Sequence, residues 1–171
     1  MGNLVKDNWI GCGIVVSAYN AGEGVADNVV KDNTVIGNSP PFATFPPYIG
    51  GIVVAADAPF TTATDNVVLN NTVAGGWIPG IIVHSNAPGD FVTGTVILGN
   101  MLDSNGFLFP PNDATKPTGI NIVAETPTSV LTNTLVIRNT VTNNYYGVWH
   151  LYDINTKIIH LQGNAIVPIA P

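Results

Sequence analysis

The side chains that could support catalysis or metal binding are few and widely spaced. His84, His150 and His160 are too scattered along the chain to predict a metal site, and His150 is expected to point into the core. Cys12 is the only cysteine, which excludes an internal disulfide and a cysteine-based metal site. The sequence has no glycine-rich phosphate loop, no Gly-x-Ser-x-Gly elbow and no Cys/His pair. We therefore predict no cofactor and identify no catalytic residues.

Two aspartates leave a calcium site open as an interpretation. Asp27 and Asp65 occupy equivalent positions in the repeat described below, six residues before an asparagine. Stacked carboxylates could bind calcium, which prefers oxygen ligands. The alternative is that each aspartate caps a turn beside Asn28 or Asn66, a role that suits its residue type.

Composition favours an all-β protein. Apolar residues make up 46% of the 171 residues and charged residues only 9%, against roughly 25% in ordinary globular domains. Repeated Val, Ile and Thr with turn-forming residues favour strands over helices. The net charge of −6 argues against a nucleic-acid partner, because phosphate binding needs a basic face. No run of 18 apolar residues is present, so we predict no membrane span.

An asparagine pattern recurs along the whole chain. The motif is an apolar residue, two residues of any type, asparagine, one residue and a second apolar residue. Its asparagines are separated by 25, 38, 29, 39 and 25 residues. They are Asn8, Asn33, Asn71, Asn100, Asn139 and Asn164. Six occurrences in frame predict a structural ladder, in which each side-chain amide bonds to the asparagine above and below it.

A glycine followed by a short alternating strand comes after each of the first five asparagine motifs. These glycines are Gly13, Gly51, Gly80, Gly119 and Gly147. A minimum unit of about 25 residues fits one solenoid coil with three short strands and three turns, and longer units then carry insertions in turns. We therefore predict a parallel β-helix of about six coils spanning residues 1–171 as one domain. The chain could be a fragment or a protomer of a longer solenoid.

The asparagine ladder and glycine strands resemble the right-handed parallel β-helix repeat family with the pectin-lyase-like fold. Pectate lyases, polygalacturonases, many phage tailspikes and periplasmic copper-maturation proteins share this fold. The resemblance covers nearly the whole chain. It implies the fold and says almost nothing about activity, because the fold hosts many functions.

The resemblance also implies where a site would lie. In the family, the loop after the asparagine turn leads into the first sheet, whose outer face usually holds the sugar-binding groove. The two longest such loops, 37–50 and 103–118, are rich in proline and aromatic residues, and a shorter loop holds Trp77. Their aromatic residues either stack on sugar rings or fill small cores beneath the loops. They are Phe42, Phe45, Tyr48, Phe107 and Phe109.

Strand alternation predicts an apolar stripe on the outer face of the first sheet. Val15, Val53, Ile82 and Trp149 are expected to point outward along it. Pectin-degrading relatives place Asp, Lys, Arg and His on this face, and this stripe has no such paired carboxylates. The family's catalytic residues therefore do not carry over. Either the long loops cover the stripe or a partner does.

Three functions follow in order of preference. The first is a non-enzymatic extracellular or cell-surface structural protein that self-associates end to end, because no amphipathic helix caps the predicted solenoid. The second is a carbohydrate-binding or tailspike-like module that binds a polysaccharide through the aromatic loops. The third is a polysaccharide lyase or hydrolase, which would need the paired carboxylates or calcium cluster that the stripe does not offer.

Overall fold

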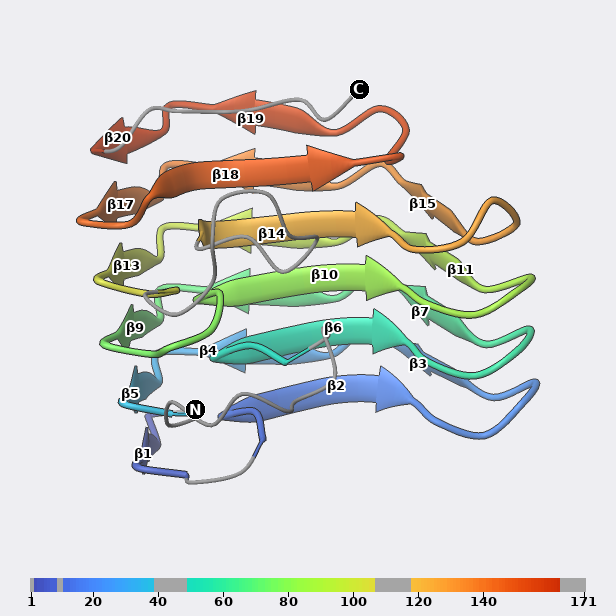
Figure 1. Ribbon diagram of the computed structural model, residues 1–171, viewed down its shortest axis with the longest axis horizontal. Coiled ribbons are helices and arrows are strands. Elements are labelled where there is room, and N and C mark those ends of the chain that lie inside the picture. Colours follow the sequence, from blue (N-terminus) through green and yellow to red (C-terminus); the bar gives the residue numbers. More distant parts are fainter. Residues whose placement is uncertain (1, 9–10, 39–48, 107–117, 164–171) are drawn as a thin grey trace.

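The computed structural model describes residues 2–8, 11–38, 49–106 and 118–163. Within these ranges the chain forms strands and turns, and it has no helix. It follows that the described part contains no helix long and apolar enough to cross a membrane. The strands form four parallel sheets, which we call A to D. Within each sheet, equivalent strands of successive circuits stack along one axis (Figure 1).

Sheets A and B contain six and five strands. Sheet A consists of β1 (Leu4–Lys6), β5 (Thr34–Ile36), β9 (Thr72–Ala74), β13 (Met101–Asp103), β17 (Thr140–Thr142) and β20 (Gln162–Gly163). Sheet B consists of β2 (Ile14–Ala18), β6 (Ile52–Ala56), β10 (Ile81–Ser85), β14 (Thr118–Ala124) and β18 (Tyr146–Leu151). Sheet B has the longest strands and begins at the predicted glycine positions.

Sheets C and D contain four and five strands. Sheet C consists of β3 (Gly24–Ala26), β7 (Thr62–Thr64), β11 (Phe91–Thr93) and β15 (Val130–Thr132). Sheet D consists of β4 (Val29–Lys31), β8 (Val67–Leu69), β12 (Val96–Leu98), β16 (Leu135–Ile137) and β19 (Lys157–Ile159).

The chain passes through the sheets in the order B, C, D, A and then begins the next circuit. Four full circuits run over β2–β5, β6–β9, β10–β13 and β14–β17, and each strand pairs in parallel with its equivalent in the next circuit. A last circuit contains β18, β19 and β20, with a single bridge from Ile154 to Thr132 in place of a sheet C strand. Each full circuit has four strands, so the predicted three strands per coil was wrong.

The corners that join sheets C, D and A explain the short strands. In the four full circuits, a residue with positive φ makes each of these corners, and an asparagine or threonine follows it. Glycine, asparagine and aspartate enter this left-handed region at the lowest cost. The eight corner residues are Asp27, Asp32, Asp65, Asn70, Gly94, Gly99, Asn133 and Arg138. Two such corners, five residues apart, fold the chain twice in each full circuit.

The corner between sheets D and A contains a row of bonded asparagines. The Nδ2 of Asn33 donates to Oδ1 of Asn71 at 2.9 Å, and Asn71 donates to Asn100 at 3.0 Å. Asn100 donates to Asn139 at 2.9 Å, and each backbone N–H donates to the same oxygen as its side chain. All four asparagines are buried. Asn164 lies outside the described residues.

The first predicted asparagine does not lie in this row. Asn8 donates its backbone N–H to Oδ1 of Asn38 at the far end of sheet A, because Val5 pairs with Val35. Asn3 begins the bonded row instead. Asn3 and Asn8 lie on either side of β1, as Asn33 and Asn38 lie on either side of β5, and the sequence motif identified the asparagine after the strand in place of the one before it.

The core lies inside the stack and is made by the middle residues of the short strands and alternate residues of sheet B. Val68, Ile97 and Val136 of sheet D are fully buried. In sheet B, Ile52, Val54, Ile81, Val83, Ile120 and Ile122 are fully buried in the same cluster, as strand alternation predicted. The outward residues of this sheet form the predicted apolar stripe.

Gly80, at the entrance to β10, provides a test of this close stacking. A Cβ there would lie 2.7 Å from Cδ2 of Leu102 and 2.8 Å from the carbonyl oxygen of Gly119. We expect Gly80→Ala to lower the free energy of unfolding by about 2 kcal/mol, since a packed core cannot accept the extra methyl group. Chemical denaturation measures this loss. The control is Gly75→Asn, at an open position with φ of 64°, where a loss as large would contradict the steric explanation.

Candidate functional site

The predicted apolar stripe forms one row across sheet B. Val15 pairs with Val53, Val53 with Ile82, Ile82 with Asn121 and Asn121 with Trp149. Val15 is 40% exposed, whereas Val53 and Ile82 are only 2% and 1% exposed. Trp149 is half-buried. Val53 and Ile82 are therefore inaccessible in the described structure, which favours the alternative that loops of the chain cover the stripe at these positions.

Segments of the same chain lie over the middle of this row. A Cβ on Gly50 would lie 2.7 Å from Cγ2 of Ile82 and 3.4 Å from Cγ2 of Val53. Cys12 packs against the cluster of Val53, Ala55 and Ile82. Of the two explanations left open by the sequence, cover by the chain itself accounts for these contacts.

Of the aromatic residues predicted to form a ligand or partner surface, Trp77 and Trp149 lie within the described residues. Trp77 is half-buried in the turn after β9. Phe42, Phe45, Tyr48, Phe107 and Phe109 lie outside the described residues. Trp149 joins a small aromatic group at the start of β18. Its ring centroid is 5.3 Å from that of Tyr146, which lies 4.7 Å from that of Tyr145.

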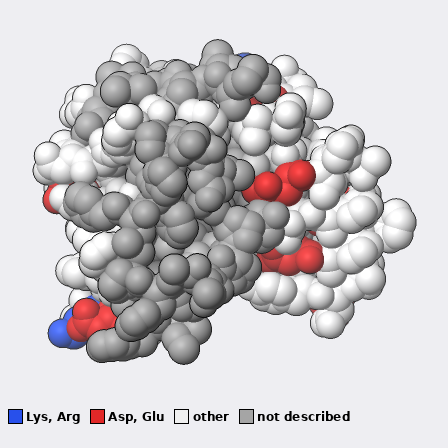
Figure 2. All heavy atoms as spheres, viewed as in Figure 1, with Lys and Arg blue, Asp and Glu red and all other residues white. Residues whose placement is uncertain are grey.

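A second row follows the carboxyl ends of the sheet B strands. The first residues after β2, β6, β10 and β14 are Tyr19, Asp57, Asn86 and Glu125, which we call the edge row. They stack because the backbone N–H groups of Asp57, Asn86 and Glu125 donate to the carbonyl oxygen of the last residue of the sheet B strand in the preceding circuit. These acceptors are Ala18, Ala56 and Ser85. Figure 2 shows two groups of acidic atoms, one above the other, where these strands end.

The edge row begins turns of five residues each (19–23, 57–61, 86–90 and 125–129) that lead into sheet C. Proline occupies the third position of the last three turns as Pro59, Pro88 and Pro127. The last residue of each turn donates its N–H back to the carbonyl of the second residue. These bonds run from Glu23 to Asn20, Thr61 to Ala58, Asp90 to Ala87 and Ser129 to Thr126. The turns therefore hold the edge row in fixed positions.

The spacing of three prolines in the sequence marks the turns that carry this row. Pro59, Pro88 and Pro127 are separated by 29 and 39 residues, the same spacings that separate the asparagines from Asn71 to Asn139. Because the turn lies directly after each glycine strand, it belongs to the same repeat. The predicted sites lay on the outer face of the first sheet and in the loops after each asparagine, so the residue beside each strand end was not predicted.

A polar group behind the edge row fixes Asp57. The Oγ of Ser17 donates to Oδ2 of Asp57, and Nε2 of His84 lies 3.5 Å from Oδ1. The Asp57 side chain is only 13% exposed. Ser17 and His84 belong to one row of sheet B, with Ala55 between them. The carboxylate is thus held from behind while one side reaches solvent.

These three residue types occur in hydrolase triads, but their arrangement here is different. In a triad, histidine accepts the proton of the serine hydroxyl and the carboxylate orients the histidine. Here Asp57 lies between Ser17 and His84, so the serine hydroxyl donates to the carboxylate. Nothing in this geometry activates the Ser17 oxygen as a nucleophile. The arrangement suits a positioned hydrogen-bond acceptor.

Burial governs the ionisation of the two other groups near Asp57. Desolvation lowers the pKa of His84 from 6.5 to about 4, although the Asp57 carboxylate acts in the opposite direction. Burial raises the pKa of the Cys12 thiol, the charge of Asp57 raises it further, and a backbone bond with Gly50 opposes both. At neutral pH the imidazole is therefore uncharged and the thiol protonated, which makes Cys12 a poor nucleophile.

Charge is distributed unevenly around the circuit. The turns between sheets B and C contain Glu23, Asp57, Asp90 and Glu125. The described basic residues lie on sheets A and D or their shared corner, as Lys6, Lys31, Arg138 and Lys157. Lys6 and Lys31 also form exposed pairs at 3.5 Å with neighbouring aspartates. The edge row therefore faces solvent with an acidic surface.

The aspartates considered for calcium lie elsewhere. Asp27 and Asp65 form corners between sheets C and D with φ of 57° and 53°, and this backbone conformation alone accounts for their residue type. Among the residues that the structure describes, no group of three His, Cys, Asp or Glu side chains could hold a metal ion.

The fold defines the class of this protein as all-β, with parallel strands stacked in four sheets in the manner of a β-helix. No protein-family model matches the chain, and neither does any curated protein or solved structure. Its function is therefore inferred from the edge row and the surfaces around it.

Proposed function

We propose that this chain is a carbohydrate-binding β-helix protein that holds an oligosaccharide along the edge row. The observation that carries the proposal is the regular placement of one aromatic or hydrogen-bonding residue per circuit, at Tyr19, Asp57, Asn86 and Glu125. Successive positions lie about 4.8 Å apart, the spacing of neighbouring strands. A linear sugar chain presents hydroxyl donors and apolar ring faces at regular intervals, and this row offers acceptors beside an exposed tyrosine.

Preorganisation supports binding as the role of Asp57. Ser17 and His84 hold its carboxylate before any ligand arrives, so little side-chain entropy is lost on binding. Tyr19, at one end of the row, is 62% exposed and leaves a ring face available for stacking. Catalysis would require an activated nucleophile or a proton donor beside the scissile bond, and the geometry around Asp57 favours neither.

Calorimetry with a panel of cello-, xylo-, manno- and chito-oligosaccharides tests this function. We expect at least one to bind, and Asp57→Asn and Tyr19→Ala to weaken it about tenfold or more, which corresponds to about 1.4 kcal/mol. Asp27→Asn is the matched control, because this exposed acid lies at another corner. No binding across the panel, or equal losses in Asp27→Asn and Asp57→Asn, would overturn the proposal. Release of reducing ends would favour hydrolysis instead.

End-to-end assembly is a second candidate function, favoured by the two ends of the core. Ile14, Val16 and Val25 in the first full circuit, and Ile158 in the last, are only partly buried, whereas equivalent interior residues are fully buried. Strands at both ends point the same way, so a head-to-tail contact would continue the sheets and propagate as a filament. We expect sedimentation to show concentration-dependent oligomers that Val16→Lys disperses. A monomer at every concentration would exclude this candidate.

We further propose that the coil is right-handed and that the chain belongs with the pectin-lyase-like β-helix repeat proteins. Support comes from the asparagine corners and from the general right-handedness of parallel crossovers. An extracellular or cell-surface location fits both candidate functions, since each concerns polysaccharide or surface assembly.

A further inference from the structure

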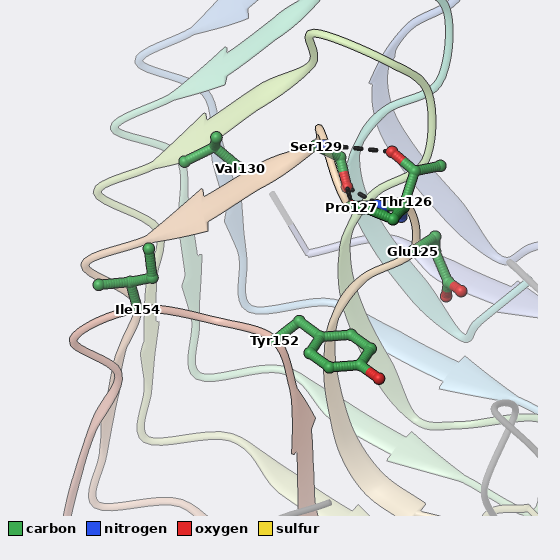
Figure 3. A pocket seen from close by; sticks show the side chains of 7 residues that line it. All are labelled: Glu125, Thr126, Pro127, Ser129, Val130, Tyr152 and Ile154. Atoms are coloured by element: carbon green, nitrogen blue, oxygen red, sulfur yellow. Dashed lines mark hydrogen bonds between the residues drawn. The ribbon is translucent and has the colours of Figure 1, made fainter. Parts of the chain in front are cut away.

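A hollow opens beside the last circuit, adjacent to the Glu125 end of the edge row. It has a volume of about 690 Å³, within the range of small-molecule sites. Seven residues line it, namely Glu125, Thr126, Pro127, Ser129, Val130, Tyr152 and Ile154. Figure 3 shows the Tyr152 ring below the turn that carries Glu125, Thr126 and Ser129, with Ile154 and Val130 on the other side.

The hollow exists because the last circuit lacks the five-residue turn. β18 ends at Leu151, and Ile154 already pairs with Thr132. Only Tyr152 and Asp153 separate them. Among the described residues, the turn 125–129 of the preceding circuit therefore has no equivalent stacked on it, and the hollow lies on that side.

Both walls of the hollow are fixed in place. In the turn, the backbone N–H of Ser129 donates to Oγ1 of Thr126 at 3.1 Å, and its Oγ donates to the Thr126 carbonyl at 2.9 Å. On the other wall, buried Asp153 bonds to Nδ1 of His150 at 2.7 Å and anchors the chain next to Tyr152. A hollow with two rigid walls can receive a ligand without first being ordered.

Tyr152 is the residue best suited to contact a ligand in this hollow. It is 70% exposed, and Ile154 beside it is 55% exposed. Its φ of 56° lies in the left-handed region, which a bulky aromatic residue adopts at a cost. An exposed aromatic ring held in a strained backbone, beside a carboxylate and small apolar side chains, matches the composition of a sugar-ring site.

We propose that this hollow binds one uncharged pyranose ring, stacked on Tyr152 with a hydroxyl group donating to Glu125, and that Glu125 disfavours uronic acids. The inference rests on the proposed function, because the hollow extends the edge row and would hold the end ring of the same oligosaccharide. It adds a chemical class of ligand, neutral hexose or N-acetylhexosamine, which the edge row alone does not specify.

The charge distribution supports the exclusion of uronic acids. Glu125 and Asp57 lie on one acidic edge, and the described lysines and arginine lie on or beside sheets A and D. A uronate carboxylate in the hollow would face Glu125 with no described cation lining the site. Two carboxylates that share one small site repel each other, and salt weakens this repulsion. The site therefore differs in ligand chemistry from the uronate-binding members of the family that the sequence resembles.

The test compares cellotriose and triacetylchitotriose with trigalacturonate, by calorimetry on the full chain at low salt. We expect a neutral trisaccharide to bind at least about tenfold more tightly than trigalacturonate, with a smaller gap at high salt. Glu125→Gln keeps an acceptor oxygen and removes the charge. It should improve trigalacturonate binding about tenfold, the equivalent of about 1.4 kcal/mol, and narrow the gap between the neutral and the charged trisaccharide.

A pair of variants at Tyr152 tests the stacking. Tyr152→Asn removes the ring but suits the left-handed backbone, so the fold should be retained, and neutral binding should weaken at least about tenfold. Tyr152→Phe keeps the ring and should retain binding within about threefold. Tyr145→Ala is the control for an exposed tyrosine at another place in the same circuit. Circular dichroism verifies that each variant is folded.

The outcomes separate this inference from the proposed function. If Asp57→Asn and Tyr19→Ala weaken binding while Tyr152→Asn changes nothing, the edge row binds sugar and the hollow does not. If Tyr152→Asn weakens binding while Asp57→Asn and Tyr19→Ala change nothing, the hollow is the site and the rest of the edge row is not. Preferential binding of trigalacturonate, or no binding of any trisaccharide, overturns the inference.

Discussion

Replacing Asn100 by alanine is expected to lower the free energy of unfolding by about 4 kcal/mol, because several buried groups lose their partners. The Oδ1 of Asn100 accepts from the backbone N–H of Asn71 at 2.8 Å and from its Nδ2 at 3.0 Å. Its Nδ2 donates to the carbonyl of Val68 and to Oδ1 of Asn139, both at 2.9 Å. Asn100 is fully buried, so water cannot replace these bonds.

Urea unfolding followed by circular dichroism measures this loss, and Asn3→Ala is the matched control. Asn3 begins the same row and donates Nδ2 to Asn33, but it is exposed and its bond can be replaced by water. Its loss should be below about 1 kcal/mol. Asn100→Asp keeps the shape and places an oxygen where a donor is needed, so it should destabilise at least as strongly at neutral pH. Equal losses in Asn100→Ala and Asn3→Ala would show that the row adds little to stability.

Acidification is expected to destabilise the protein through His84, by about 3 kcal/mol between pH 6.5 and about 4. In the unfolded chain the imidazole takes up a proton near pH 6.5. In the folded protein, burial keeps His84 uncharged until about pH 4. Across this window the unfolded state binds more protons, so stability rises with pH. Above the window, the histidine makes no pH-dependent contribution.

Denaturation of the wild type and of His84→Gln across this pH range isolates the effect. In His84→Gln, the free energy of unfolding should fall less on acidification than in the wild type. His160→Gln, at an exposed position, should follow the wild type. Asp57→Asn should extend the loss of stability to lower pH, because without the Asp57 carboxylate the pKa of His84 in the folded protein falls further. Parallel curves for the wild type and His84→Gln would contradict the assignment. Carboxylates that titrate in both proteins contribute equally to both curves, so their contribution cancels when the two curves are subtracted.

Strand direction, sheet stacking and the inward residues of sheet B could be predicted because they depend on local periodicity. Ile52, Val54, Ile81 and Val83 alternate with outward residues, and a strand turns successive side chains to opposite faces whatever surrounds it. Repeated asparagine motifs at varying intervals indicated equivalent circuits with insertions. These signals are contained within a few residues of chain, so no long-range contact is needed to interpret them.

The register of the first repeat and the number of strands per circuit could not be read in this way. Only Asn8 fulfils the whole asparagine motif, because just two residues precede Asn3 in the sequence, and it is pairing between the strands that places Asn3 in the bonded row. The corner between sheets C and D has threonine at Thr95 and Thr134, where an asparagine would have revealed a fourth strand. Pairing between circuits decides both questions.

The sequence by itself thus determined an all-β solenoid with buried asparagines and a glycine at the entrance to the longest strands. Only the tertiary structure decided which polar residues share a surface. Asp57 and Glu125 are 68 residues apart, and they share one edge because two circuits of intervening chain return to the same corner. Likewise, Val53 and Ile82 alternate outward as predicted, yet they are buried because residues near Gly50 lie across them. Local periodicity sets the direction of a side chain, whereas its neighbours and its access to water depend on contacts between distant segments.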